Sequence, residues 1–216
     1  RKDMGVNSTD DLKGKTLGVW FYGNEYPFLS WMSRLGLATD GSANGVTVLK
    51  QGWGVEPLTE GQAACVSTMS YNEYWVVRDA GYTPEQLTVF KYQAEGASTL
   101  EDGLYVLEKN LGDDSFKDKM VRFVRASMKG WKYAEANPKE AASIILDNDD
   151  AGVQTEKHQI RMMGEIAKLT AGSNGSLDPS DYERTVKVLM SGASDPVITK
   201  EPSGAWTHDI TNAALN

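Results

Sequence analysis

The chain has 216 residues, of which 40% are apolar and 24% are charged, a composition that suits one or two compact domains with a substantial core. Its net charge of −8 argues against nucleic acid as a partner, because phosphate binding requires a basic face. No apolar run reaches the roughly 18 residues that a membrane-spanning helix needs.

The first half of the chain alternates between predicted strands and predicted helices. Helical periodicity predicts helices over residues 24–35, 57–61 and 71–80. This alternation predicts an α/β fold with a mostly parallel sheet covered by helices on both faces, and ligands of such folds bind at the carboxyl ends of the strands. Apolar runs predict the strands over residues 15–22, 46–50, 64–70, 87–92 and 104–107.

After residue 113 the pattern predicts helices only. A long helix is capped by Asp114 or Ser115 and ends at Asn137, before a proline that starts the next helix. Two further helices are predicted over residues 155–170 and from Pro179 onward. Their apolar stripes need a sheet on the other side of the core, which is either the first sheet or a set of strands that precede residue 1.

The junction after the first predicted strand is the strongest candidate site. There the apolar run passes into a helix that opens with Asn24 and Glu25, and the N–H groups at a helix start are available to a ligand. Trp20 and Tyr22 add flat apolar walls, and Glu25 adds a hydrogen-bond anchor for a small planar molecule. The alternative is a pair of ordinary strand aromatics followed by a helix cap and a carboxylate that the helix dipole favours.

Two other strand ends carry candidate ligand groups. Ser70, Tyr71 and Asn72 follow the third predicted strand, where hydroxyl and amide groups can bind the polar edge of a ligand. The same stretch fits a capping box, because Glu73 follows Ser70 by three residues. Trp53 stands between two glycines and is either a ligand wall or a plug against the core.

Glu101 and Asp102 form a carboxylate pair before the fifth predicted strand. Adjacent side chains of an extended segment point to opposite sides, so the pair is not predicted to act as an acid–base dyad. We interpret Asp102 and Gly103 as a turn and Glu101 as a candidate cleft residue. The full candidate set is Trp20, Tyr22, Asn24, Glu25, Trp53, Ser70, Tyr71, Asn72 and Glu101.

The sequence offers no enzyme motif, cofactor motif or metal site. Its two histidines, His158 and His208, have no ligand partner at helical spacing, and Cys65 is the single cysteine. The glycine-rich and serine motifs of nucleotide binding and hydrolysis are absent. We therefore expect a binding protein rather than an enzyme, with no cofactor and no metal.

Four motifs resemble one family. Residues 11–19 (DLKGKTLGV) resemble the segment that enters the second lobe of the solute-binding proteins of ABC importers, a segment shared with nitrate and sulfonate binders. Residues 23–26 (GNEY), 69–74 (MSYNEY) and 100–106 (LEDGLYV) resemble the branch that binds thiamine-pyrimidine precursors and is related to yeast pyrimidine-synthesis enzymes. The resemblance covers nearly the whole chain.

The resemblance implies a periplasmic-binding-protein type II fold, a venus flytrap that clamps its ligand between two lobes. Mapped here, residues 8–97 form one complete ligand-binding lobe, and residues 98–216 form the hinge return and the C-terminal helical part of the other. The family carries roughly a hundred residues more upstream, so we expect a chain that lacks the N-terminal part of that lobe. We also expect a homodimer through the incomplete lobe.

The resemblance implies a solute-binding component of an ABC importer, periplasmic or tethered outside the membrane, that presents a thiamine-pyrimidine-like heterocycle to its permease. The alternatives are a pyrimidine-synthesis enzyme on the same fold, although the cysteine-rich iron motif of those enzymes is missing, and a ligand-sensing module. By the same resemblance, Glu25 is the polar anchor, Trp20, Tyr22 and Trp53 are walls, and Ser70, Tyr71 and Asn72 contact the ligand edge.

Overall fold

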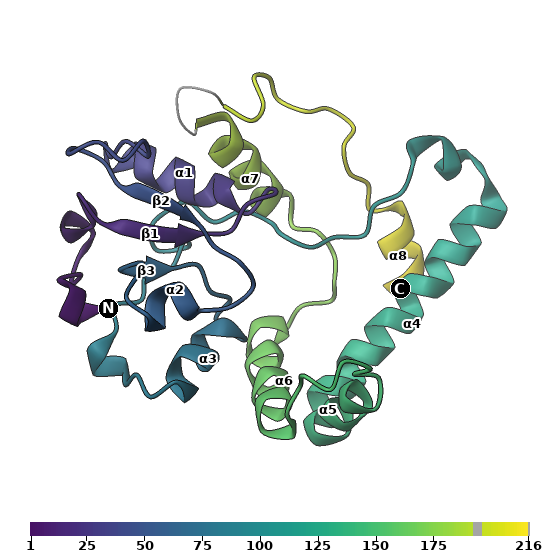
Figure 1. Ribbon diagram of the computed structural model, residues 1–216. Helices are drawn as coiled ribbons and strands as arrows, with labels where there is room; N and C mark the ends of the chain where they lie inside the picture. The colour runs from purple at the N-terminus through teal and green to yellow at the C-terminus, as the bar shows by residue number, and fades with distance from the viewer. Residues whose placement is uncertain (192–195, 216) are drawn as a thin grey trace. The chain divides into compact units, whose positions relative to one another are not determined.

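The computed structural model describes residues 1–191 and 196–215, whose helices and strands are shown in Figure 1. The chain divides into two units. Unit 1 comprises Arg1–Leu100 and Pro179–Pro202, and unit 2 comprises Glu101–Asp178 and Ser203–Asn216. Unit 1 contains the sheet, whereas the regular structure described in unit 2 is helical. How these units relate to the two predicted lobes stays a prediction.

Unit 1 is built on a small parallel sheet, so the predicted α/β class is confirmed. Its strands are β1 (Thr16–Val19), β2 (Thr47–Lys50) and β3 (Cys65–Val66). β1 lies in the middle, and both neighbours run parallel to it in the order β2-β1-β3 (Figure 1). Because parallel strands end at one edge of a sheet, the segments that follow them meet there.

The helices of unit 1 confirm the predicted helical segments, with ends shifted by one or two residues in the first three. They are α1 (Glu25–Arg34), α2 (Glu56–Thr59), α3 (Glu73–Asp79) and α7 (Pro179–Ser191), together with 3₁₀ turns at Lys2–Met4, Thr9–Leu12 and Pro84–Gln86. On α1, Phe28, Trp31 and Met32 recur at helical spacing and are buried in one core cluster with Leu17 and Val19 of β1. This packing fixes the start of α1 beside the end of β1.

Two of the five predicted strands are wrong. Residues 87–92 form no strand, and the Phe90 and Tyr92 rings pack instead on Trp31, with ring centroids 5.3 and 6.0 Å away. Residues 104–107 lie exposed in unit 2 and pair with no strand of the described chain. An apolar run becomes a strand only where a neighbouring backbone pairs with it, and spacing along the sequence does not record that neighbour.

α7 returns to unit 1 from far along the sequence and packs against α1 (Figure 1). The Arg184 Nε donates a hydrogen bond to the Ser98 carbonyl at 3.3 Å, and the Thr185 Oγ1 accepts one from the Leu100 N–H at 2.8 Å. The last residues of the N-terminal stretch are thus held by a helix that begins about eighty positions later.

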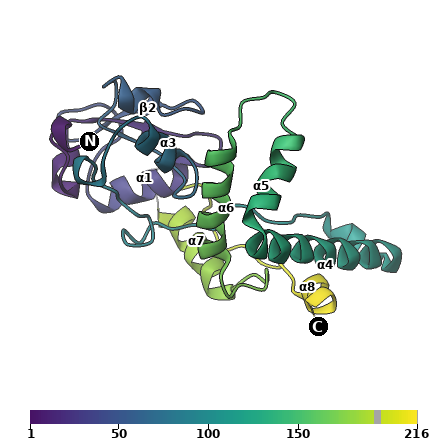
Figure 2. The ribbon, with the colours of Figure 1, turned by 90° about the horizontal axis from the view of Figure 1, so that it is seen from below.

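Unit 2 consists of helices joined by loops. The predicted boundary at Asn137 is confirmed, while the cap of the long helix is Asp113, one residue earlier than predicted, whose carboxylate accepts from the Ser115 and Phe116 N–H groups. Figure 2 shows α5 beside α6 and α4 beside α8. None of the described helices is both long and apolar enough to cross a bilayer. The elements are a 3₁₀ turn at Glu108–Gly112, α4 (Asp114–Ala136), α5 (Pro138–Asp147), α6 (Glu156–Thr170) and α8 (Asp209–Leu215).

Candidate ligand-binding site at the strand ends

Three chain segments converge at the carboxyl edge of the sheet, as the sequence predicts. They follow β1 (residues 20–25), β2 (residues 51–53) and β3 (residues 67–72). The Gln51 N–H donates to the Val19 carbonyl at 2.9 Å, and the Ser67 N–H donates to the Gly18 carbonyl at 3.0 Å. The ladder therefore continues one residue past each outer strand, which fixes where the following loops start.

Trp53 stands fully exposed on the loop after β2. Its side chain is 96% exposed, so the alternative of a plug against the core is wrong. The loop itself is tied to the central strand, because the Trp20 Nε1 donates to the Gly52 carbonyl at 3.0 Å. The Trp20 indole N–H is thus occupied by protein, and its ring is half-buried.

Tyr22 is the second exposed aromatic, with 91% of its surface free. It is the only non-glycine residue of the described chain with a positive φ, at 65°, a conformation that is costly for a residue with a Cβ. The Lys50 Nζ lies 4.4 Å from the centre of the Tyr22 ring, 5.5 Å from that of Phe21, and donates to the Tyr22 hydroxyl at 3.1 Å. A cation held against an aromatic face is favourable even at the surface.

Lys50 was not among the candidates that the sequence singled out. It is the last residue of β2, so its neighbour Tyr22 is close only through the pairing of β2 with β1. The signal that points to it is its place at the end of a predicted strand, which is the same signal that identified Tyr22.

At the start of α1 the polar groups turn toward their own backbone. The Glu25 Oε2 accepts from the Gly23 N–H at 2.7 Å, and the Asn24 Nδ2 donates to the Phe21 carbonyl at 3.2 Å. These contacts correspond to the local alternative of helix-start stabilisation. The role of Glu25 as a ligand anchor stays a prediction. In that role the other carboxylate oxygen of the half-buried Glu25, Oε1, would accept from the ligand.

The segment after β3 shows a related arrangement. The Glu73 Oε2 accepts from the Met69 N–H at 2.9 Å, and its Oε1 accepts from the Asn72 side-chain amide at 2.8 Å. Glu73 therefore reaches back over the helix start as in a capping box, with Met69 as its backbone donor. Ser70 is exposed, and Tyr71 and Asn72 are half-buried beside it, so all three lie on the predicted segment.

Glu101 is placed differently, since it opens unit 2 and is not part of the three segments of unit 1. Its side chain is exposed. Nearby atoms nevertheless remove enough water from the carboxyl to raise its pKa, and the neighbouring charge of Asp102 raises the pKa further.

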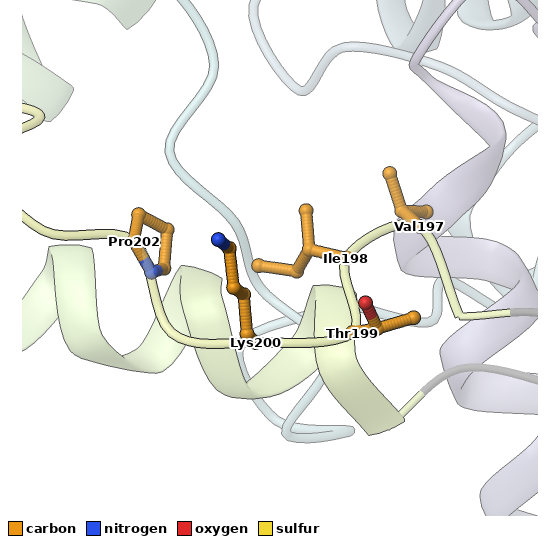
Figure 3. Close-up of a pocket in the computed structure, with 5 residues that line it drawn as sticks. All are labelled: Val197, Ile198, Thr199, Lys200 and Pro202. Atoms are coloured by element: carbon orange, nitrogen blue, oxygen red, sulfur yellow. The ribbon is translucent and has the colours of Figure 1, made fainter.

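A separate hollow on unit 1 follows α7 and is formed by one continuous stretch of chain (Figure 3). Among the residues that the structure describes, its lining includes none of the predicted site residues and no polar group from another element, so it lacks the convergence that a specific ligand site needs. Among the described residues, no three His, Cys, Asp or Glu side chains gather as metal ligands would. The residues that line the hollow are Val197, Ile198, Thr199, Lys200 and Pro202.

A comparison with known protein families identifies the family of this chain. A family model described as NMT1/THI5 like matches residues 1–141, which include all three converging segments. The chain belongs to this family. The NMT1/THI5-like family consists of ABC solute-binding proteins of the nitrate, sulfonate, taurine and thiamine-pyrimidine-precursor type, so the resemblance found in the sequence is confirmed. No curated protein matches the chain significantly.

Proposed function

We propose that this chain is the solute-binding component of an ABC importer and that its ligand is a small aromatic heterocycle, most specifically a pyrimidine precursor of thiamine. Membership of the NMT1/THI5-like family supports a solute-binding function. The observation that carries the ligand class is the pair of exposed aromatics, Tyr22 and Trp53, on neighbouring strand ends. Exposed aromatic side chains at the carboxyl edge of a parallel sheet offer flat faces on which a planar ring can stack.

The proposed mode of binding uses stacking and edge recognition. Tyr22 and Trp53 supply flat apolar faces, and the ordered loops beneath them limit the entropy that is lost on binding. Ser70, Tyr71 and Asn72 supply hydroxyl and amide groups for the ring nitrogens of the ligand, and Glu25 accepts from an exocyclic amine.

We further propose that the protein works outside the cytoplasm as a venus flytrap, closing two lobes on its ligand and presenting it to a membrane permease. We propose binding without catalysis, since both histidines lie in unit 2, outside the three strand-end segments, and the His208 Nε2 contacts the Leu177 carbonyl at 2.8 Å. Pairing of two chains stays a prediction that sedimentation tests.

Calorimetric titration with hydroxymethylpyrimidine, thiamine and riboflavin tests the ligand class. We expect saturable binding of hydroxymethylpyrimidine, with weaker or no heat from riboflavin. Absence of binding to all three compounds, with a folded chain verified by circular dichroism, would remove the pyrimidine class. Turnover of a bound pyrimidine would instead favour the enzyme alternative.

A further inference from the structure

We infer that Gln51 is a positioning residue that holds the Trp53 loop in its binding conformation by bridging the ends of the two outer strands. The inference rests on the proposed function, because it assigns Gln51 a part in forming the same ligand wall. Gln51 itself is 5% exposed, so it is placed to act through the loop and not by touching a ligand.

The side-chain amide of Gln51 forms hydrogen bonds of the kind that the backbone of a neighbouring strand would form. Its Oε1 accepts from the Ser67 N–H at 2.9 Å, and its Nε2 donates to the Ser67 carbonyl at 2.9 Å. One amide group thus pairs with both polar groups of a single residue, as a neighbouring strand would. Since Gln51 follows β2 and Ser67 follows β3, the contact links the two strands that do not touch each other in the sheet.

The link passes the central strand at a glycine. A Cβ on Gly18 of β1 would lie 3.2 Å from the Gln51 Oε1 and 2.9 Å from Val66 Cγ1, so a side chain there would crowd the amide. Gly18 therefore leaves the space through which Gln51 reaches Ser67.

The same amide also holds the loop that carries the exposed indole. The Gln51 Nε2 donates to the Gly54 carbonyl at 3.2 Å, while the Trp20 Nε1 donates to the Gly52 carbonyl on the other side of Trp53. Both carbonyls that flank Trp53 are thus held by side chains of the protein. Glycine-flanked loops are flexible by themselves, so these two contacts restrict the backbone on both sides of the exposed ring.

The geometry has a consequence for binding. A ligand that stacks on Trp53 meets a loop whose backbone is already held, so less conformational entropy is lost when the complex forms. Gln51→Met keeps the size of the side chain and removes both the donor and the acceptor. We expect the Trp53 indole of this variant to gain fast motion and hydroxymethylpyrimidine to bind about 3- to 10-fold more weakly, since ordering one such side chain on binding costs on that scale.

The primary test is the nitrogen-15 relaxation of the Trp53 indole in the ligand-free chain, with its resonance assigned by Trp53→Phe. Gln62→Met is the matched control, because Gln62 is an exposed glutamine of unit 1 whose side-chain amide donates to the Glu60 carboxylate at 2.8 Å. We expect increased motion of the Trp53 indole in Gln51→Met and unchanged motion in Gln62→Met. Equal indole relaxation in wild type and folded Gln51→Met overturns the inference.

Gln51→Glu separates positioning from general stability. An ionised carboxylate keeps an acceptor for the Ser67 N–H but faces the Ser67 and Gly54 carbonyls without a donor, and burial raises the pKa of such a carboxyl. Protonation at lower pH restores one donor. We expect the Trp53 indole of Gln51→Glu to regain its order as the pH falls from about 8 to 5, over a range in which the wild type is constant.

The two proposals fail in different ways. If the wild type binds none of the pyrimidines, the proposed function fails, while the relaxation of the ligand-free indole still decides the role of Gln51. If the wild type binds and Gln51→Met binds with equal affinity despite a mobile indole, the positioning role in binding is overturned and the proposed function stands.

Discussion

The indole nitrogen of Trp20 donates to the carbonyl of Gly52 at 3.0 Å and so ties the end of the central strand to the loop that follows its neighbour. Sequence reasoning placed Trp20 in the ligand wall as a stacking group. The observed contact gives Trp20 a second role, which is to hold the backbone next to the exposed Trp53.

Replacing Trp53 by alanine is expected to weaken ligand binding about 10- to 100-fold, because stacking of a heterocyclic base on an aromatic side chain contributes roughly 1–3 kcal/mol. The melting temperature of Trp53→Ala should stay close to that of the wild type, since the Trp53 ring contributes almost no buried surface to unit 1. Calorimetric titration and a thermal melt measure both. Trp131→Ala, on the partly exposed face of α4, serves as the control, and wild-type affinity in Trp53→Ala would contradict the stacking role.

Tyr22 allows the cost of its backbone conformation to be measured. Tyr22→Val is expected to lower the free energy of unfolding by about 1–2 kcal/mol although the side chain is exposed, because a β-branched residue tolerates a positive φ poorly. Tyr22→Asn, which accepts the left-handed region, should differ from the wild type by less than about 0.5 kcal/mol. Urea unfolding provides the comparison, and equal stability of the two variants would show that the conformation relaxes.

Gly18→Ala tests the close packing of the central strand. The added methyl would meet Val66 Cγ1 at 2.9 Å, so we expect a loss of about 1–3 kcal/mol in the free energy of unfolding. Gly52→Ala is the matched control in the same unit, because its Cβ would meet no atom within 4 Å. A Gly18→Ala variant as stable as Gly52→Ala would mean that the strand ends rearrange freely.

The raised pKa of Glu101 predicts how the free energy of unfolding depends on pH. Partial desolvation and the charge of Asp102 raise its pKa in the folded chain above the ordinary value of 4.5, so ionisation of this carboxyl opposes folding. Between the two pKa values, the folded chain holds a proton that the unfolded chain has released. The loss of stability that this carboxyl causes is therefore fully present above the pKa of the folded chain and vanishes below the pKa of the unfolded chain. Glu101→Gln should therefore be more stable than the wild type at pH 7 and equal to it below about pH 4.

The direct measurement is a titration of the Glu101 side-chain carbon by nuclear magnetic resonance, with Asp102→Asn as the companion variant. Its midpoint should lie above 4.5 in the wild type and move down when the neighbouring charge is removed. A wild-type midpoint at or below 4.5 would rule out this dependence.

How far the sequence predicts this molecule depends on whether a signal is local. The helix from Glu25 and the break at Asn137 follow from caps and spacing within a few residues, and both are confirmed. The strand predicted over residues 87–92 is wrong because no neighbouring backbone pairs with that segment, and its Phe90 and Tyr92 rings pack on Trp31, which is far away in sequence. For the same reason the sequence pointed to Tyr22 and Trp53 but missed Lys50 and Gln51, whose contacts depend on the order β2-β1-β3.

The return of α7 to unit 1 also determines when that unit can be completed during synthesis. Ser98 and Leu100 leave the ribosome long before Arg184 and Thr185, with which they pair. Until then α1 lacks the helix that packs against it, and the nascent sheet unit has an open flank. A polypeptide that stops near residue 100 would contain every strand of the described sheet and all three strand-end segments, and it would still lack the helix that packs against α1.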